Sequence, residues 1–294
     1  MKTVEKEAIP SSTAGDLLPL KTIEGILNSH CVGSVWHVQQ RPKLVQSIAF
    51  VAVGQAFTAR RILHELSPGS PPFIKSLQEE AKIRLTVQDD YKSGERYGYP
   101  TYQRDGFIFE VVSWVAALQN HGKEVLLKDP HTSATSQGLD GLMITLSADR
   151  SRVDLTTIFE DKCTENARET FRDKVIPGFQ DRHSNKRGAE LVATASTLLR
   201  MAAVDADAVA MLSASVMDRT LRSYRAAFAL TSEFELIEAR QKLFKGYEKI
   251  VDLDSSRRIG ACFIVEGELR EWFNVLAEDV RKYLDDWELE VNNV

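Results

Sequence analysis

Hydrophobic and polar residues recur with two different spacings along this chain, so the sequence predicts both helices and strands. Apolar positions three and four residues apart, or apolar runs of helical length, predict one set of elements as helices. These are expected at residues 42–66, 73–87, 106–119, 166–175, 188–203, 233–250 and 269–287. Shorter apolar and β-branched runs predict strands at 139–146, 153–163, 224–230 and 259–265. This order predicts an α/β fold in which helices flank a mixed sheet.

The first 16 residues are small and polar, and we expect them to form a flexible arm. The remaining length suits one large domain or two small ones, and we expect a single α/β domain at 17–294. That domain divides into a helical N-terminal part, a central core and an extension with the order strand–helix–strand–helix. These three parts are expected at residues 17–105, 106–205 and 206–294.

The composition is that of a folded globular protein with a slightly acidic balance. Its 294 residues include 37 Lys and Arg against 42 Asp and Glu, a formal net charge of -5. Bulk charge therefore gives no attraction to phosphates, which at first argues against a nucleic-acid-binding protein. The three cysteines are too few for a disulfide framework, and no apolar stretch is long enough to span a bilayer. We therefore expect a cytoplasmic protein without a membrane partner.

Two carboxylates and a lysine fall on the two central predicted strands. Side chains alternate along a strand, so Glu160 and Lys162 are expected on one side and Asp161 on the other. If the two strands form a hairpin, Asp140 at the start of the first lies beside Glu160 at the end of the second. The two carboxylates and the backbone carbonyl of Asp161 then make an all-oxygen site, which Mg²⁺ or Mn²⁺ favours. Lys162 is expected to orient a water molecule or to stabilise negative charge on a phosphate.

This arrangement resembles the PD-(D/E)XK nuclease superfamily. The resemblance rests on Asp140, nineteen intervening residues and then Glu160-Asp161-Lys162, on a hairpin that follows an acidic helix. It covers about residues 106–187 and implies a restriction-endonuclease-like core that hydrolyses DNA phosphodiester bonds with Mg²⁺ or Mn²⁺. It also implies that the Asp and the Glu hold the metal and that the Lys serves the attacking water. Leu139 stands where the family often has Pro, a difference that removes no ligand.

The same resemblance implies two further site residues. Many members add a glutamate from the helix before the hairpin, and Glu110, in an otherwise apolar helix, matches it as a further catalytic residue and metal ligand. A carboxylate there needs a partner, which is either a metal or, in a purely structural role, a backbone donor or an arginine such as Arg104. Some members place a Gln on the helix after the lysine strand. Gln180 is the candidate, although Pro177 and Gly178 are expected to interrupt that helix.

A narrower resemblance concerns the setting in which such a nuclease acts. The chain length, the acidic helix, the two site motifs and the C-terminal extension are similar to the nuclease subunits of Hachiman-type bacterial antiviral-defence systems. That resemblance implies a helicase or ATPase partner. The chain has no Walker-type phosphate loop, because Gly122-Lys123 is followed by Glu124 rather than by Ser or Thr. We therefore expect any ATP to be used by the partner chain.

Contacts to DNA phosphates are expected from the segment that follows the lysine strand. This segment, residues 163–190, carries six basic and five acidic residues, so its charges are equally typical of a solvated helix surface. The candidates for nucleic-acid binding are Arg168, Arg172, Gln180, Lys186 and Arg187.

Two other classes of protein remain compatible with the sequence. One is a catalytically silent nuclease-fold subunit used in binding or assembly, although a dead site has no reason to keep all three site residues. The other is a metal-free α/β interaction protein whose carboxylates are surface charges. In that protein Asp140 and Glu160 would lie on opposite faces or more than about 8 Å apart, too far to share an ion.

Overall fold

The computed structural model describes residues 18–65, 72, 74–90, 95–121, 125–132 and 138–292, without the side chains of 64–65 and 288–292. Its centre is a seven-stranded sheet with the order β1-β2-β7-β6-β5-β4-β3. The strands are β1 Leu20–Asn28, β2 Cys31–Val38, β3 Val125–Leu127, β4 Gly141–Leu146, β5 Val153–Cys163, β6 Arg222–Thr231 and β7 Arg258–Val265. Parallel pairs join β2 to β7, β7 to β6 and β6 to β5, whereas β1–β2, β5–β4 and β4–β3 are antiparallel. The expected mixed sheet is confirmed, and the arm expected at residues 1–16 lies outside the described residues.

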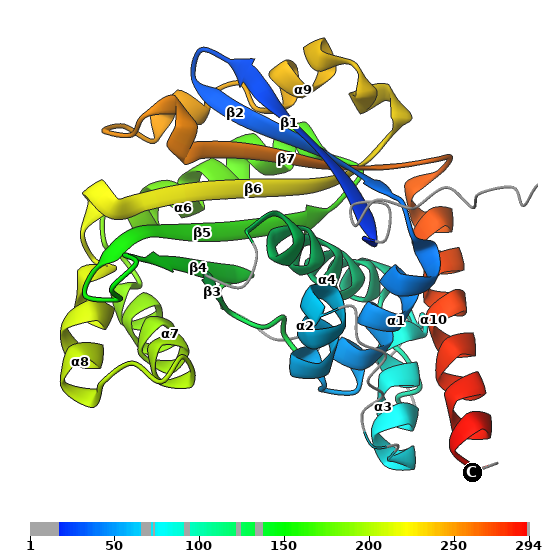
Figure 1. The fold of residues 1–294 in the computed structure, drawn as a ribbon. Coiled ribbons are helices and arrows are strands. Elements are labelled where there is room, and N and C mark those ends of the chain that lie inside the picture. The colour runs from blue at the N-terminus through cyan, green and yellow to red at the C-terminus, as the bar shows by residue number, and fades with distance from the viewer. Residues whose placement is uncertain are drawn as a thin grey trace, which may run out of the picture.

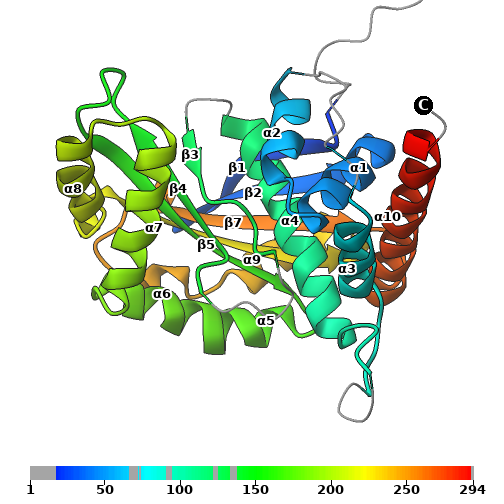
Figure 2. The same cartoon turned by 90° about the horizontal axis from the view of Figure 1, so that it is seen from below.

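Helices flank this sheet on both faces (Figure 1). One layer contains α1 Arg41–Ala52, α2 Ala56–Glu65, α3 Lys75–Leu85, α4 Thr101–His121 and α10 Leu269–Asn292. The other contains α5 Ala167–Thr170, α6 Ile176–His183, α7 Gly188–Met201, α8 Ala206–Ser215 and α9 Ile237–Leu243. Figure 2 shows α5 and α6 on the side of the sheet away from α1 and α2. Within the described part of the chain, no helix is long and apolar enough to cross a membrane.

The alternation of side chains along β5 decides which layer each residue meets. Phe159 belongs to the apolar core shared with α1, α4 and α10, whereas Ile158 belongs to the core shared with α6 and α7. The same alternation assigns Asp161 to the first side and assigns Glu160 and Lys162 to the second. The sheet therefore separates the Asp161 side chain from its two charged neighbours.

Several element boundaries differ from the sequence prediction. The helix predicted at 42–66 is two helices, because Gly54 takes a φ of 78°, a left-handed conformation that ends α1. The prediction of one helix at 233–250 is wrong, since only Ile237–Leu243 is α-helical and short 3₁₀ turns flank it. Pro177 does not interrupt its helix. The helical backbone runs from α5 through the π-helical turn Phe171–Val175 into α6, and Pro177 stands just after this wider turn.

The N-terminal part, expected to be helical, begins with the hairpin of β1 and β2. β1 is an edge strand whose residues are mostly exposed, so it lacks the apolar alternation by which a half-buried strand is recognised. The sequence pattern likewise predicts neither the three-residue β3 nor α8.

Candidate active site

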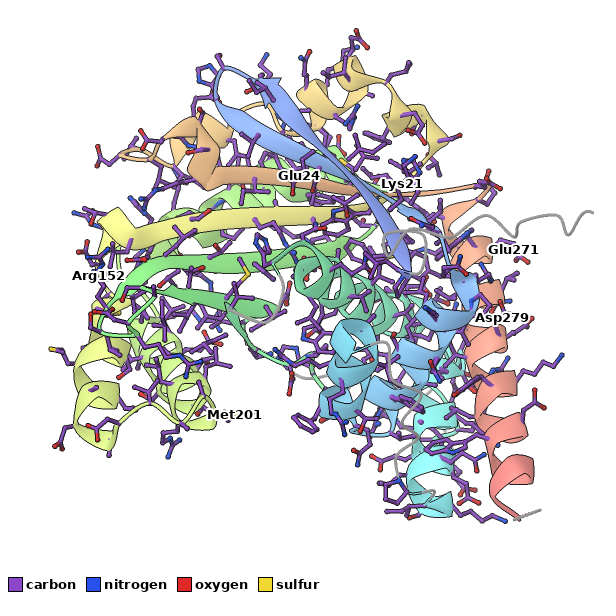
Figure 3. The ribbon with its side chains drawn as sticks, viewed as in Figure 1. Lys21, Glu24, Arg152, Met201, Glu271 and Asp279 are labelled. Carbon is purple, nitrogen blue, oxygen red and sulfur yellow. The ribbon has the colours of Figure 1, made fainter. Side chains whose placement is uncertain are left out.

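The hairpin of β4 and β5 brings Asp140 and Glu160 together. Gly141 pairs with Phe159 in the antiparallel register, and Asp140, directly before Gly141, therefore falls opposite Glu160. Only glycine fits at position 141 without a rearrangement, because a Cβ there would collide with the Phe159 ring. Arg152 lies at the other end of the hairpin, where Figure 3 shows it at the turn between the two strands.

Lys162 links the two carboxylates. Its Nζ lies 3.0 Å from Oδ2 of Asp140 and 2.7 Å from Oε1 of Glu160. The backbone N–H of Asp161 donates a second hydrogen bond, of 2.8 Å, to the same Oδ2 of Asp140. The expected side of the strand is confirmed for Glu160 and Lys162, and Asp140 is held in place by two donors from β5.

Burial and charge oppose each other in this cluster. Burial raises the pKa of Glu160, the nearby Asp140 carboxylate raises it further, and Lys162 opposes both effects. Burial alone would lower the pKa of Lys162, but Asp140 and Glu160 outweigh it and the pKa is raised. Lys162 is therefore a firmly charged ammonium group, and it compensates two crowded carboxylates.

Asp161 points to the opposite side, as the alternation predicts. Its side chain is 3% exposed, and its Oδ1 lies 3.4 Å from Nη2 of Arg225 on β6. Arg225 also sits over the Phe159 ring, 3.5 Å from the ring centre. Burial raises the pKa of Asp161 to about 7, although the Arg225 charge acts in the other direction. Only the backbone of Asp161 takes part in the cluster on the other face.

Glu110 of α4 is engaged by His131. The backbone N–H of His131 donates to Oε1 of Glu110 at 2.8 Å, and its Nδ1 lies 2.9 Å from the same oxygen and 3.1 Å from Oε2. Lys128 Nζ lies 3.4 Å from Nε2 of His131. Burial lowers the pKa of Lys128, while Glu110 and Asp140 act to raise it. In the structure, Glu110 therefore contacts both the backbone N–H and the imidazole of His131. Arg104, the alternative partner, pairs with Asp105 instead.

A cleft of about 460 Å³ brings part of this set together. Its polar lining includes Glu110, His131, Asp140, Asp161, Lys162 and Lys174, but neither Glu160 nor Lys128. The sequence does not single out Lys128, which directly follows β3 in the connection to β4. Arg225 could have been found, because it is the one charged residue within the predicted strand 224–230, although Arg222 opens the observed β6.

The candidates for phosphate binding are spread around the second helix layer, and most have partners within the protein. Arg168 donates to the backbone carbonyls of Leu243 and Lys245, and Gln180 donates to that of Lys249. The three remaining cations pair with nearby carboxylates, namely Arg172 with Asp173, Lys186 with Asp181 and Arg187 with Glu190. None of the five lines the cleft; Lys174 does.

The carboxylates of Asp140 and Glu160 are the oxygen donors that the cluster offers to a divalent ion. Among the described residues, no group of three or more His, Cys, Asp or Glu is placed to hold a metal. Asp140 and Glu160 both contact Lys162 Nζ, so their contacting oxygens lie within about 6 Å of each other, whereas a metal-free surface pair was expected beyond about 8 Å. Two carboxylates completed by water suit Mg²⁺, which is often bound through one or two carboxylates and keeps several waters.

Neither a protein-family model, nor a curated protein, nor a solved structure matches this chain. The fold and the site together define an α/β protein with a carboxylate–lysine cluster at the end of a central hairpin.

Proposed function

We propose that this chain is a Mg²⁺-dependent nuclease of the PD-(D/E)XK type that hydrolyses DNA phosphodiester bonds. The observation that carries the proposal is the position of Lys162 Nζ, 3.0 Å from Asp140 and 2.7 Å from Glu160, beside an open cleft. The order of elements supports it as well: the mostly apolar helix α4, which carries Glu110, precedes the hairpin, and a helix and a parallel strand follow it. These are the parts that the sequence resemblance implies.

Each residue of the cluster has a role in this reaction. Asp140 and Glu160 provide the oxygen ligands, and the Asp161 N–H fixes the Asp140 carboxylate. A bound Mg²⁺ supplies Lewis acidity toward the phosphate and lowers the pKa of the attacking water. Lys162 orients that water or stabilises the negative charge that develops on the phosphate. Glu110 orders the His131 segment along the cleft and is proposed as a further ligand after it separates from His131.

We further propose that an ATP-driven helicase partner delivers the DNA, in the setting of bacterial antiviral defence. The net charge of -5 gives little intrinsic attraction to phosphates. Local charge does not reverse this, because Lys186 and Arg187 already pair with Asp181 and Glu190. A partner that holds the DNA and presents it to the cleft would take over the role that a basic surface has in other DNA-binding proteins. A helicase gene beside this one, and copurification of its product, would support this setting.

The test of the nuclease proposal is cleavage of plasmid and linear DNA by the purified chain, with and without the partner, in Mg²⁺ and in EDTA. Lys162→Ala is expected to reduce cleavage by at least about 100-fold, because it removes the charge that faces the reacting phosphate. Arg152→Ala is the matched control, since Arg152 is a charged residue on the same hairpin with a side chain that is 75% exposed. Equal cleavage by the Lys162→Ala variant and the wild type would refute the proposal.

A second candidate function is a catalytically silent nuclease-fold subunit for binding or assembly. It is favoured by the contact of Glu110 with His131 and by the absence, among the described residues, of a three-ligand metal group. This candidate predicts no cleavage by any variant under any of these conditions, together with retained binding to the partner. The cleavage assay therefore separates the two functions.

A further inference from the structure

The cleft beside the carboxylate–lysine cluster continues along one face of α4, beyond the residues that the proposed reaction uses. Tyr102, Gly106 and Glu110 line it and are spaced by four residues, so they lie on the same side of this helix. At a rise of about 1.5 Å per residue, Tyr102 lies about 12 Å along the helix from Glu110. A Cβ at Gly106 would meet nothing within 4 Å. The helix therefore leaves room in the cleft between Tyr102 and Glu110.

Tyr102 presents an uncovered aromatic ring at the far end of this face. The residue is 61% exposed, and no ring or cation of the described part of the chain packs on it. Its hydroxyl accepts a hydrogen bond of 3.3 Å from the neighbouring Gln103, a contact that leaves the faces of the ring free. An exposed ring on the wall of a cleft offers a flat surface to another planar group. Proteins that hold single-stranded nucleic acids stack bases on aromatic side chains in this way.

Lys174 gives the cleft a positive charge that no carboxylate neutralises. Two other Lys or Arg side chains line the cleft, Lys162 and Arg270, and each contacts two carboxylates. Lys174 is exposed and forms no ion pair with the residues that the structure describes. It lies in the π-helical turn Phe171–Val175, and such turns are frequent at functional sites. A phosphate that enters the cleft therefore meets an uncompensated cation at Lys174.

We propose that the cleft holds single-stranded rather than duplex DNA, with one base stacked on Tyr102 and a backbone phosphate at Lys174. This inference rests on the proposed function and names its substrate class. Inside a duplex both faces of a base are covered by its neighbours, so the Tyr102 ring has access only to a base of an unpaired strand. Stacking needs no positive surface, which suits a chain with a net charge of -5. An unpaired strand is also the product of a helicase.

The test is fluorescence anisotropy of a labelled single strand and of a blunt duplex of the same sequence, each titrated with the full chain. The titrations are made in EDTA, so that no strand is cut, and at low ionic strength, where phosphate contacts are strongest. We expect the single strand to bind at least about 10-fold more tightly than the duplex. Equal binding of the two probes, tighter binding of the duplex, or no binding of the single strand would overturn the inference.

Two tyrosines of equal exposure provide a variant and its control. Tyr97 and Tyr102 are both 61% exposed, but only Tyr102 lines the cleft. Tyr102→Ala is expected to weaken single-strand binding by about 5-fold or more, and Tyr102→Phe to retain it, because the ring stacks without its hydroxyl. Tyr97→Ala is expected to leave the affinity unchanged. Equal effects of Tyr97→Ala and Tyr102→Ala would show that the strand does not stack on Tyr102.

The phosphate contact has a separate readout in the salt dependence of binding. Lys174→Gln is expected to lower the slope of log affinity against log salt by about 0.7, the value for one phosphate of a single strand. Lys186→Gln is the control, because Lys186 pairs with Asp181 and lies outside the cleft. Gly106→Leu is expected to weaken binding by occupying the space beside Tyr102, and it favours the helix, so that unfolding does not explain the loss.

Cleavage in Mg²⁺ is measured separately from binding. Cleavage that is equal for single strand and duplex, and unchanged by Tyr102→Ala, would overturn this inference and leave the nuclease proposal standing. Binding of the single strand that depends on Tyr102, without cleavage of any DNA, would refute the nuclease proposal and leave the strand-binding site standing.

Discussion

Asp161 gives a prediction that links burial to the pH dependence of stability. Its pKa is about 7 in the folded protein, against 3.8 for an ordinary Asp, and burial is the main cause. Between these two values the folded state holds a proton that the unfolded state has released. The free energy of unfolding therefore falls as the pH rises through this range, and the loss is complete above about pH 7. A difference of about three pKa units corresponds to about 4 kcal/mol.

Asp161→Asn removes this titration, because Asn resembles the protonated carboxyl group. The substitution also changes the contact between residue 161 and Arg225. Because Arg225 is charged at both pH values, this effect on stability is the same at each pH and cancels in the comparison. Between pH 5 and pH 8, we expect the stability of the variant to rise by about 3 kcal/mol relative to the wild type. The measurement is urea-induced unfolding of both proteins at each pH.

The control is Asp154→Asn, on the same strand but with a side chain that is 40% exposed. It is expected to change stability by a similar small amount at both pH values. A difference between Asp161→Asn and the wild type that stays constant from pH 5 to pH 8, or that shrinks, would refute the assignment of a raised pKa to a buried Asp161.

Three further substitutions test other parts of the structure by urea unfolding. Lys162→Met leaves two partly buried carboxylates uncompensated, so we expect a loss of about 2 kcal/mol at pH 8 and a smaller loss at pH 5; equal losses would contradict this. Gly141→Ala places a methyl group against Phe159 and should cost about 1–3 kcal/mol, whereas Gly25→Ala, with nothing within 4 Å, should cost clearly less. Gly54→Ala forces a left-handed conformation on Ala and should cost about 1–2 kcal/mol, unless the end of α1 rearranges.

The central elements follow from the sequence because local pattern and tertiary position agree there. The apolar run of α4 is buried along most of its length, and the alternation along β5 correctly assigns Glu160 and Lys162 to one side. The hairpin register was predictable from the short connection between the two strands. Prediction failed at β1, where an exposed edge strand carries little apolar signal, and at 233–250, where short turns replace a regular helix.

The sequence by itself determined which charged residues meet at the hairpin, because strand pairing is local and side chains alternate with a period of two. Only the tertiary structure decided the partners of Glu110 and Arg225. Glu110 meets His131, which lies in a connecting segment 21 residues away. Arg225 meets Asp161 on the neighbouring strand β5 and Ser113 on the helix α4. Such contacts depend on how separate elements pack, and no spacing in the sequence encodes that packing. For the same reason the cleft lined by Glu110, His131 and Lys162, which joins α4 to the β4–β5 hairpin, is visible only in the folded chain.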